Sequence, residues 1–148
     1  MANYLNHWKQ AQHNEAFAAE LAGHDPLPYL DWLITVSFYA AVHYAEALFF
    51  FQEGIVHTES ACPDQMSQHA FRMRKIREIL GKQCWKSYRK LQVSSYNVRY
   101  LGLAQEKPAD IAVQYYSLQD AKRMYSVHLQ KVRDAIQQEL DQSTASGS

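Results

Sequence analysis

The last part of the chain carries an apolar pattern typical of one long amphipathic helix. Between residues 110 and 141, apolar or aromatic side chains return every three or four positions. The pattern comprises Ile111, Tyr115, Leu118, Ala121, Tyr125, Leu129, Val132, Ile136 and Leu140. This spacing places all of these side chains on one face of a helix. Exposing an apolar face of this length to water is unfavourable. We therefore expect the rest of the chain to supply helices that cover it.

Four further segments have helical patterns, and glycine or proline separates most of them. We expect helices over residues 3–22, 29–53, 64–80 and 82–100, with Asp64 as an N-cap and with Gly54 and Gly81 as stops. Only five glycines and four prolines occur in 148 residues, which excludes a sandwich or barrel of many short strands. Short connections between long amphipathic helices favour antiparallel neighbours. We therefore predict an all-α fold, an up-and-down bundle of four to five antiparallel helices.

The length suits one domain, which we place at residues 1–141, followed by a disordered tail over residues 142–148. The N-terminal residues lack the pattern of a signal peptide. Residues 32–51 are apolar enough to be tested as a membrane span, but His43 and Glu46 lie near their middle, where charge is costly in lipid. We predict that this segment is the buried central helix of a bundle. Two cysteines without metal spacing fit a reducing compartment, so we expect a cytoplasmic protein with no membrane partner.

Charge is balanced in total but is unevenly placed along the chain. Residues 1–71 contain one base against eight acids, whereas residues 72–99 contain nine bases against Glu78 alone. Such a basic segment can contact phosphates or an acidic partner. It can equally pack against the acidic first half of the same fold. If the segment binds RNA, we expect His69, Arg72, Arg74 and Lys75 to contact phosphate.

Several polar residues have spacings that suggest a site. His43 and Glu46 are one helical turn apart in the most apolar helix, either as a structural pair or as an acid–base pair in a cleft. His69 and Arg72 are also one turn apart, and the planar fork of Arg72 suits an anion. Arg99 and Tyr100 end the fourth helical segment. There Arg99 is expected either to hold a carboxylate, such as that of Glu46, or to serve in catalysis.

Common enzyme motifs are missing from the sequence. It contains no glycine-rich phosphate loop, no GxSxG and no HExxH, so a P-loop or Rossmann nucleotide site is unsupported. A metal-dependent bundle would have to use His43, Glu46, His57 or His69 as ligands, but the paired Glu-x-x-His motifs of carboxylate-bridged bundles are missing. We therefore predict no cofactor and no metal site.

Two segments resemble the HEPN superfamily, in particular its small bacterial and archaeal members with a YYAA-type second helix. These segments are FYAAVHYAEALFFFQEG (Phe38–Gly54) and YRKLQVSSYNVRY (Tyr88–Tyr100), followed by the long final helix. The resemblance implies a helical bundle, usually a homodimer with a cleft between protomers. Many members are metal-independent endoribonucleases of toxin–antitoxin or antiphage (antiviral defence) systems, and others are inactive RNA-associated modules.

Active members of the superfamily carry an arginine, four to six residues and then a histidine. In that chemistry the histidine is the general acid or base at the ribose 2′-hydroxyl, and the arginine stabilises the phosphate charge. Arg123 and His128 match this motif literally, but they lie well inside the final helix. At about 100° per residue, α-helical geometry would turn their side chains about 140° apart. Arg99 corresponds better by position, and its histidine would then be His43 or His69.

Two functions of different classes follow from this resemblance. The first is a HEPN-like domain that binds or cleaves RNA. The alternative is a non-catalytic dimerisation or partner-binding module, for example one that caps a nucleotidyltransferase. Both readings imply a homodimer, and the second implies a cognate partner protein.

Overall fold

The computed structural model describes residues 4–100 and 116–146, and within these ranges all regular elements are helices. The first five are α1 (Tyr4–Ala22), α2 (Leu30–Glu53), the short α3 (Thr58–Ala61), α4 (Gln68–Leu80) and α5 (Lys82–Tyr100). The last three follow one another without a break: α6 (Leu118–Arg123), η3 (Met124–Leu129) and α7 (Gln130–Ser146). Together they form one long final helix.

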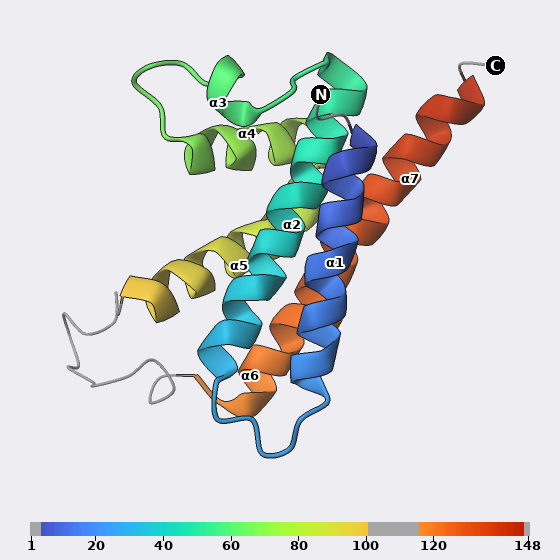
Figure 1. Cartoon of the computed structure of the whole chain (residues 1–148). Coiled ribbons are helices and arrows are strands. Elements are labelled where there is room, and N and C mark those ends of the chain that lie inside the picture. The colour runs from blue at the N-terminus through green and yellow to red at the C-terminus, as the bar shows by residue number, and fades with distance from the viewer. Residues whose placement is uncertain (1–3, 101–115, 147–148) are drawn as a thin grey trace.

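The long helices pack side by side as an up-and-down bundle (Figure 1). Helix α1 runs antiparallel to α2, and the chain reverses again between α5 and the final helix. Helix α4, drawn in light green, crosses the end of the bundle where α2 terminates. The predicted all-α bundle is confirmed.

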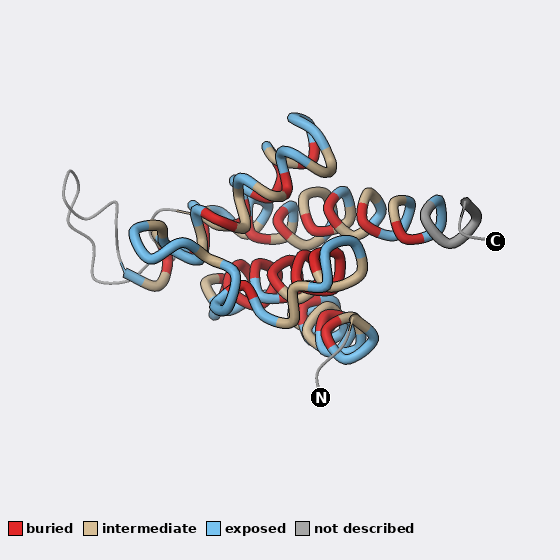
Figure 2. The backbone as a smooth tube through the Cα atoms, turned by 90° about the horizontal axis from the view of Figure 1, so that it is seen from above, coloured by how far each residue is buried: buried red, intermediate tan, exposed pale blue. Residues whose placement is uncertain are grey.

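Helix α2 is the centre of the fold because it is apolar on nearly every side. Figure 2 shows buried residues along the inner helices, with exposed residues on the outward sides of α1 and α4. By length and composition, α2 is the single described helix that could cross a membrane, and 78% of its most apolar window is buried inside this fold. That burial agrees with the expected role of α2 as the central helix.

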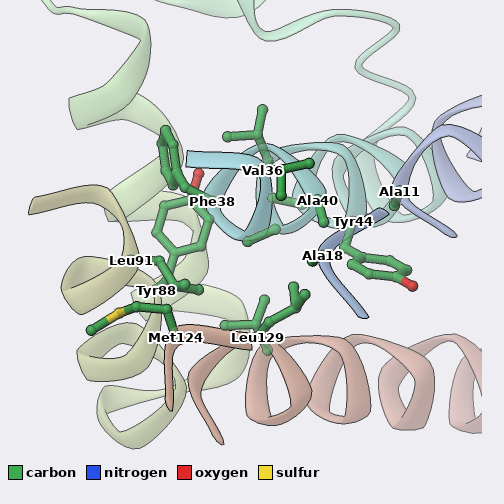
Figure 3. Packing of buried hydrophobic residues seen from close by; sticks show 14 of the residues in the cluster. Ala11, Ala18, Val36, Phe38, Ala40, Tyr44, Tyr88, Leu91, Met124 and Leu129 are labelled. Carbon is green, nitrogen blue, oxygen red and sulfur yellow. The ribbon is translucent and has the colours of Figure 1, made fainter. Parts of the chain in front are cut away.

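Aromatic side chains fill the space between α2, α5 and the final helix. The rings of Phe38 and Tyr88 meet edge to face, with 6.1 Å between their centroids. Figure 3 shows Leu91 and Met124 close to Tyr88, and Leu129 of the final helix below α2. All five side chains are at most 2% exposed. This packing fixes α5 and the final helix against α2, and with them the polar groups described below.

The glycine stops were predicted correctly, but one helix start was not. Gly54 and Gly81 follow α2 and α4 with φ values of 69° and 89°, a conformation that glycine adopts without steric strain. Helix α4 begins after Ser67 rather than at Asp64, because the Ser67 hydroxyl accepts a hydrogen bond from the Ala70 N–H. Between the segments predicted to be helical, residues Thr58–Ala61 form the additional short helix α3.

The final helix differs from its prediction at both ends. It begins after Ser117, which forms a capping box with Asp120, rather than near residue 110. Residues 110–115, including Ile111 and Tyr115 of the predicted apolar face, lie outside the described residues. At the other end α7 continues to Ser146, past the end at residue 141 that the apolar pattern indicated. Residues 118–146 contain no glycine or proline that would stop the helix earlier.

A π-helical turn interrupts the final helix at residues 124–129. Its first and last residues, Met124 and Leu129, are buried. Leu129 is therefore in the core, as the apolar pattern of the sequence predicts, and His128 beside it is partly exposed.

Helix α2 is nevertheless not buried on every side. Val36 and Glu46 are buried, but Trp32 is 58% exposed and Tyr39 is 39% exposed. The two exposed aromatic side chains are seven residues apart on one face of α2. Covering that face would need a further element, and the described helices do not cover it.

Candidate functional sites

Glu46 is the best-connected acid in the interior. Its carboxylate accepts hydrogen bonds from the backbone N–H and the hydroxyl of Thr58, at the start of α3. Arg72 Nε of α4 donates to Glu46 Oε1 at 2.7 Å, and both side chains are largely buried. The carboxylate therefore ties α2 to α3 and α4. The expectation that Arg99 might hold Glu46 is wrong, because Arg72 is the arginine that α4 brings to it.

His43 lies one turn before Glu46, and its hydrogen-bond partner is His7 rather than that carboxylate. Its Nδ1 is 3.4 Å from Nδ1 of His7, and the rings of these two residues are stacked. His7 Nε2 lies 3.2 Å from the carbonyl oxygen of Val56, and His57 meets the His7 ring edge-on. Burial first, and then the charge of His7, lower the pKa of His43. This cluster joins α1 and α2 to the segment before α3.

Arg99 is held by neutral groups. Its Nε donates to the carbonyl and the hydroxyl of Ser95, and its NH1 donates to the Tyr39 hydroxyl at 3.0 Å. The guanidinium also lies over the rings of Tyr39 and Tyr100, 5.5 Å and 5.1 Å from their centroids. The ion pairs among the described residues do not include Arg99. Its charge is therefore not neutralised by a carboxylate from the described part of the fold.

Two adjoining hollows lie on the surface that Tyr39 divides. One, of about 440 Å³, is lined by Tyr39, Val42, Gln68, His69 and Arg72. The other, of about 380 Å³, is lined by Asp31, Trp32, Thr35, Tyr39, Val98 and Arg99. Tyr39 belongs to both linings, so the two hollows meet at its side chain, over α2 and between α4 and the end of α5. We call the two hollows together the Tyr39 groove.

His69 is placed in this groove by the first turn of α4. Its Nδ1 is 3.4 Å from Arg72 NH1, while Arg72 NH2 donates to Gln68 Oε1 at 3.3 Å. Burial lowers the pKa of His69, and the charges of Arg72 and Arg99 lower it further. The sequence offered His43 and His69 as partners of Arg99. His69 lines the Tyr39 groove, as Arg99 does, whereas His43 lies in the cluster with His7 and His57.

Arg74 and Lys75 are engaged in ion pairs within the fold. Lys75 Nζ lies 2.8 Å from Glu53 Oε1, and Arg74 pairs with Glu78 on the exposed side of α4. Together with Arg72–Glu46, the Lys75–Glu53 pair joins the basic segment to acids of the first half of the chain. Part of the charge asymmetry is therefore neutralised inside the fold. Arg74 and Lys75 do not line the Tyr39 groove.

The Arg123–His128 motif spans the π-helical turn, and this changes its geometry. Arg123 is the last residue of α6, and His128 is the fifth residue of η3. Hydrogen bonds between residues five apart widen the helical turn, so a five-residue step here rotates the side chains by less than the roughly 140° of α-helical geometry. Arg123 is the sixth residue of the final helix, which begins at Leu118.

The surroundings of His128 combine one orienting contact with several positive charges. Nδ1 is 3.3 Å from the Ser87 hydroxyl of α5, which orients the ring. Burial lowers the pKa of His128, and the charges of Lys131, Arg123 and Lys90 lower it further. Three cations contributed by α5, α6 and α7 thus act on His128 and disfavour its protonated form. We call His128, Arg123, Lys90 and Lys131 the His128 patch.

No group of three or more histidine, cysteine, aspartate or glutamate side chains has a metal-binding arrangement within residues 4–100 and 116–146. The four ligands considered from the sequence do not converge on one point. Glu46 is occupied by Thr58 and Arg72, His43 and His57 each contact His7, and His69 lies in the Tyr39 groove.

Sequence reasoning missed the residues that complete each of these arrangements. Ser87, Lys90 and Lys131 are brought to His128 by tertiary packing, and no spacing in the chain signals them. His7 is likewise brought to His43 by the packing of α1 on α2. Tyr39 gave no signal of its own, because an aromatic side chain in so apolar a segment is expected to be buried.

The protein-family models, curated proteins and solved structures compared with this chain include no match.

Proposed function

We propose that this protein is an RNA-directed helical domain of the HEPN type and that the His128 patch cleaves RNA without a metal. The observation that carries the proposal is the π-helical turn between Arg123 and His128, which reduces the angle between their side chains, together with the action of the Arg123 charge on His128. π-Helical turns occur frequently at functional sites. Helical bundle architecture and the FYAAVH segment support the same assignment.

The proposed reaction is transfer of the RNA phosphoryl group to the neighbouring 2′ oxygen. A neutral His128 accepts the proton of the 2′-hydroxyl as the 2′ oxygen bonds to phosphorus. The bond from phosphorus to the 5′ oxygen breaks, and that oxygen takes a proton back from the imidazolium, directly or through water. The products are a 2′,3′-cyclic phosphate and a 5′-hydroxyl. Arg123, Lys90 and Lys131 stabilise the negative charge of the phosphate during the transfer.

The surroundings of His128 favour the unprotonated imidazole that the first step of this reaction requires. A general base must be unprotonated at the working pH, and both burial and the neighbouring cations lower the pKa of His128. Ser87 restrains Nδ1, so Nε2 is the nitrogen we assign to the 2′-hydroxyl. Such an activity belongs to a cytoplasmic protein of a toxin–antitoxin or antiviral defence system, and we expect a homodimer.

The test is cleavage of a mixed RNA pool by purified protein in excess EDTA at low salt, where phosphate contacts are strongest. Wild type should yield fragments with cyclic phosphate ends, and His128→Gln and Arg123→Ala should each lower the rate by 100-fold or more. His13→Gln and Arg89→Ala are matched controls on exposed positions of α1 and α5. Full activity in His128→Gln would remove the proposed site. Absence of cleavage by wild type would leave the alternative function, a non-catalytic module that binds a partner protein.

A further inference from the structure

We propose that a cavity between α1 and the final helix binds a quaternary ammonium group, held by the rings of Trp8 and Tyr125 and by the carboxylate of Glu15. Tyr44 and Arg133 also line this cavity, which we call the Trp8 cavity. Its volume is about 430 Å³, within the range of sites for small ligands. None of the four residues of the His128 patch lines it, and the proposal does not rest on the proposed function.

The Trp8 cavity lies between helices that are far apart in the sequence. Trp8, Glu15 and Ala16 share one face of α1, and the small side chain of Ala16 leaves room beside the final helix. Figure 3 shows Tyr44 extending from α2 into the space between α1 and the final helix. Because Tyr44 is only 1% exposed, it forms the floor of the cavity.

Aromatic rings from three helices meet at this cavity. The rings of Trp8 and Tyr44 lie edge to face, with 4.7 Å between their centroids and 68° between their planes, so they form a corner. Tyr125 adds a third ring from η3, and both Trp8 and Tyr125 are partly exposed. A quaternary ammonium ion has no N–H to donate, so its attraction to aromatic rings is the main interaction that can select it.

The ion pairs at the cavity carry one more negative than positive charge. Arg133 NH1 donates to Glu15 Oε2 at 2.6 Å, while Nε and NH2 of Arg133 both donate to Asp134 Oδ1. One guanidinium is thus shared by two carboxylates, and each of its nitrogens already has an anionic partner. The excess negative charge attracts a cation and repels an anion.

The negative charge reaches the floor of the cavity. The Tyr44 hydroxyl donates to Glu15 Oε1 at 2.7 Å, which holds this carboxylate beside the aromatic corner. Burial is the main cause of the raised pKa of Tyr44, and the charges of Glu15 and Asp134 add to it. Both carboxylates therefore act inside the cavity. A carboxylate next to aromatic rings is the combination that suits an organic cation.

A quaternary ammonium group can belong to a small free compound such as choline or to a trimethylated lysine side chain of another protein. The two sources share the same charged head. Tighter binding of a short trimethyllysine peptide than of choline would identify a protein chain as the source. Equal or weaker binding of the peptide would identify the free compound.

The experiment is titration of isotope-labelled wild-type protein with choline and with 3,3-dimethylbutanol, its uncharged analogue of the same shape, followed by nuclear magnetic resonance at low salt. The indole N–H signals of Trp8, Trp32 and Trp85 are assigned by substituting each residue in turn. We expect choline to shift the Trp8 signal and to leave the other two unchanged. Choline should bind about fivefold or more tightly than the alcohol.

Two variants remove one negative charge each. Glu15→Gln should weaken choline binding about fivefold, and Asp134→Asn, which is farther from the rings, about twofold. Asp134 is 67% exposed, so this variant tests the proposal even if Glu15→Gln alters the fold, which circular dichroism would show. Asp64→Asn is the matched control, since Asp64 is exposed and does not line the cavity.

Three outcomes would overturn the proposal. The first is a Trp8 signal that does not move at about 20 mM choline. The second is equal binding of choline and its uncharged analogue, which would mean that the cavity selects shape alone. The third is the same choline affinity in Asp134→Asn and Asp64→Asn.

Discussion

The guanidinium of Arg72 and the carboxylate of Glu46 form a buried ion pair, with 2.7 Å between Arg72 Nε and Glu46 Oε1. The pair joins the central helix α2 to α4, the helix that borders the Tyr39 groove. The backbone N–H and the hydroxyl of Thr58 donate further hydrogen bonds to the same carboxylate. Because all the groups are away from water, the pair is more sensitive to loss of one partner than a surface pair is.

Substitution Arg72→Met should destabilise the protein by about 3–5 kcal/mol, because it leaves the Glu46 carboxylate buried without its counter-charge. The double variant Glu46→Gln/Arg72→Met should recover much of that loss. Urea denaturation measures both free energies of unfolding. Arg74→Met is the control, since the exposed Arg74–Glu78 pair should contribute less than about 1 kcal/mol. Equal losses of stability in Arg72→Met and Arg74→Met would show that the Arg72–Glu46 pair contributes no more to the free energy of unfolding than an exposed ion pair does.

Two buried tyrosines allow a comparison between a hydroxyl that has a hydrogen-bond partner and one that has none. The Tyr88 hydroxyl has no hydrogen-bond partner among the described residues, whereas the Tyr44 hydroxyl donates to Glu15 at 2.7 Å. Tyr88→Phe should therefore be neutral or stabilise the protein by about 1 kcal/mol, and Tyr44→Phe should cost about 1.5–3 kcal/mol. Thermal unfolding of the two variants gives the comparison. A larger loss in Tyr88→Phe than in Tyr44→Phe would contradict it.

The free energy of unfolding should decrease as the pH falls below about 6.5. His43, His69 and His128 each have a pKa in the folded state below the ordinary value of 6.5. Between that value and their lowered pKa, the unfolded chain binds more protons than the folded one, so acidification favours unfolding. Stability from these groups is complete above pH 6.5 and is lost as the pH falls through their folded pKa values.

His43→Gln isolates one contribution to this pH dependence. His43 faces His7 of α1, with Glu46 on its own helix and Arg72 on α4, and burial is the largest cause of its lowered pKa. The variant should show a shallower loss of melting temperature than wild type between pH 7 and pH 5.5. Parallel curves for the two proteins, or a melting temperature that rises on acidification, would be inconsistent with the lowered pKa.

The helices could be predicted from the sequence because their signals are local. Gly54 and Gly81 end helices whichever elements pack nearby, and the apolar repeat of the final helix identifies most of its buried face. The start of α4 was misplaced because Asp64 and Ser67 are both good N-caps by residue type. Only the structure shows that the Ser67 side chain makes the capping bond.

The polar contacts could be predicted only where they depend on spacing within one helix. His69 and Arg72 are adjacent as predicted, since one helical turn separates them. The partner of Glu46 could not be predicted, because it depends on how α4 packs across α2. The π-helical turn was missed for a related reason. Its residues pack against α2 and α5, and contacts with other helices have no signal in the local sequence.

The imidazole of His128 should titrate below 6.5, and removing neighbouring charge should raise its pKa. Burial is the largest cause of the lowered value, followed by the charges of Lys131, Arg123 and Lys90. Nuclear magnetic resonance of the ring protons over pH 4–8 measures this pKa in wild type, Arg123→Gln and Lys131→Gln. Each variant should shift it upward, and added salt should do the same in wild type by screening the three cations. A wild-type pKa above 6.5, or one unchanged by both substitutions and by salt, would mean that the cations do not act on His128 and would leave it without the charge state required of a general base.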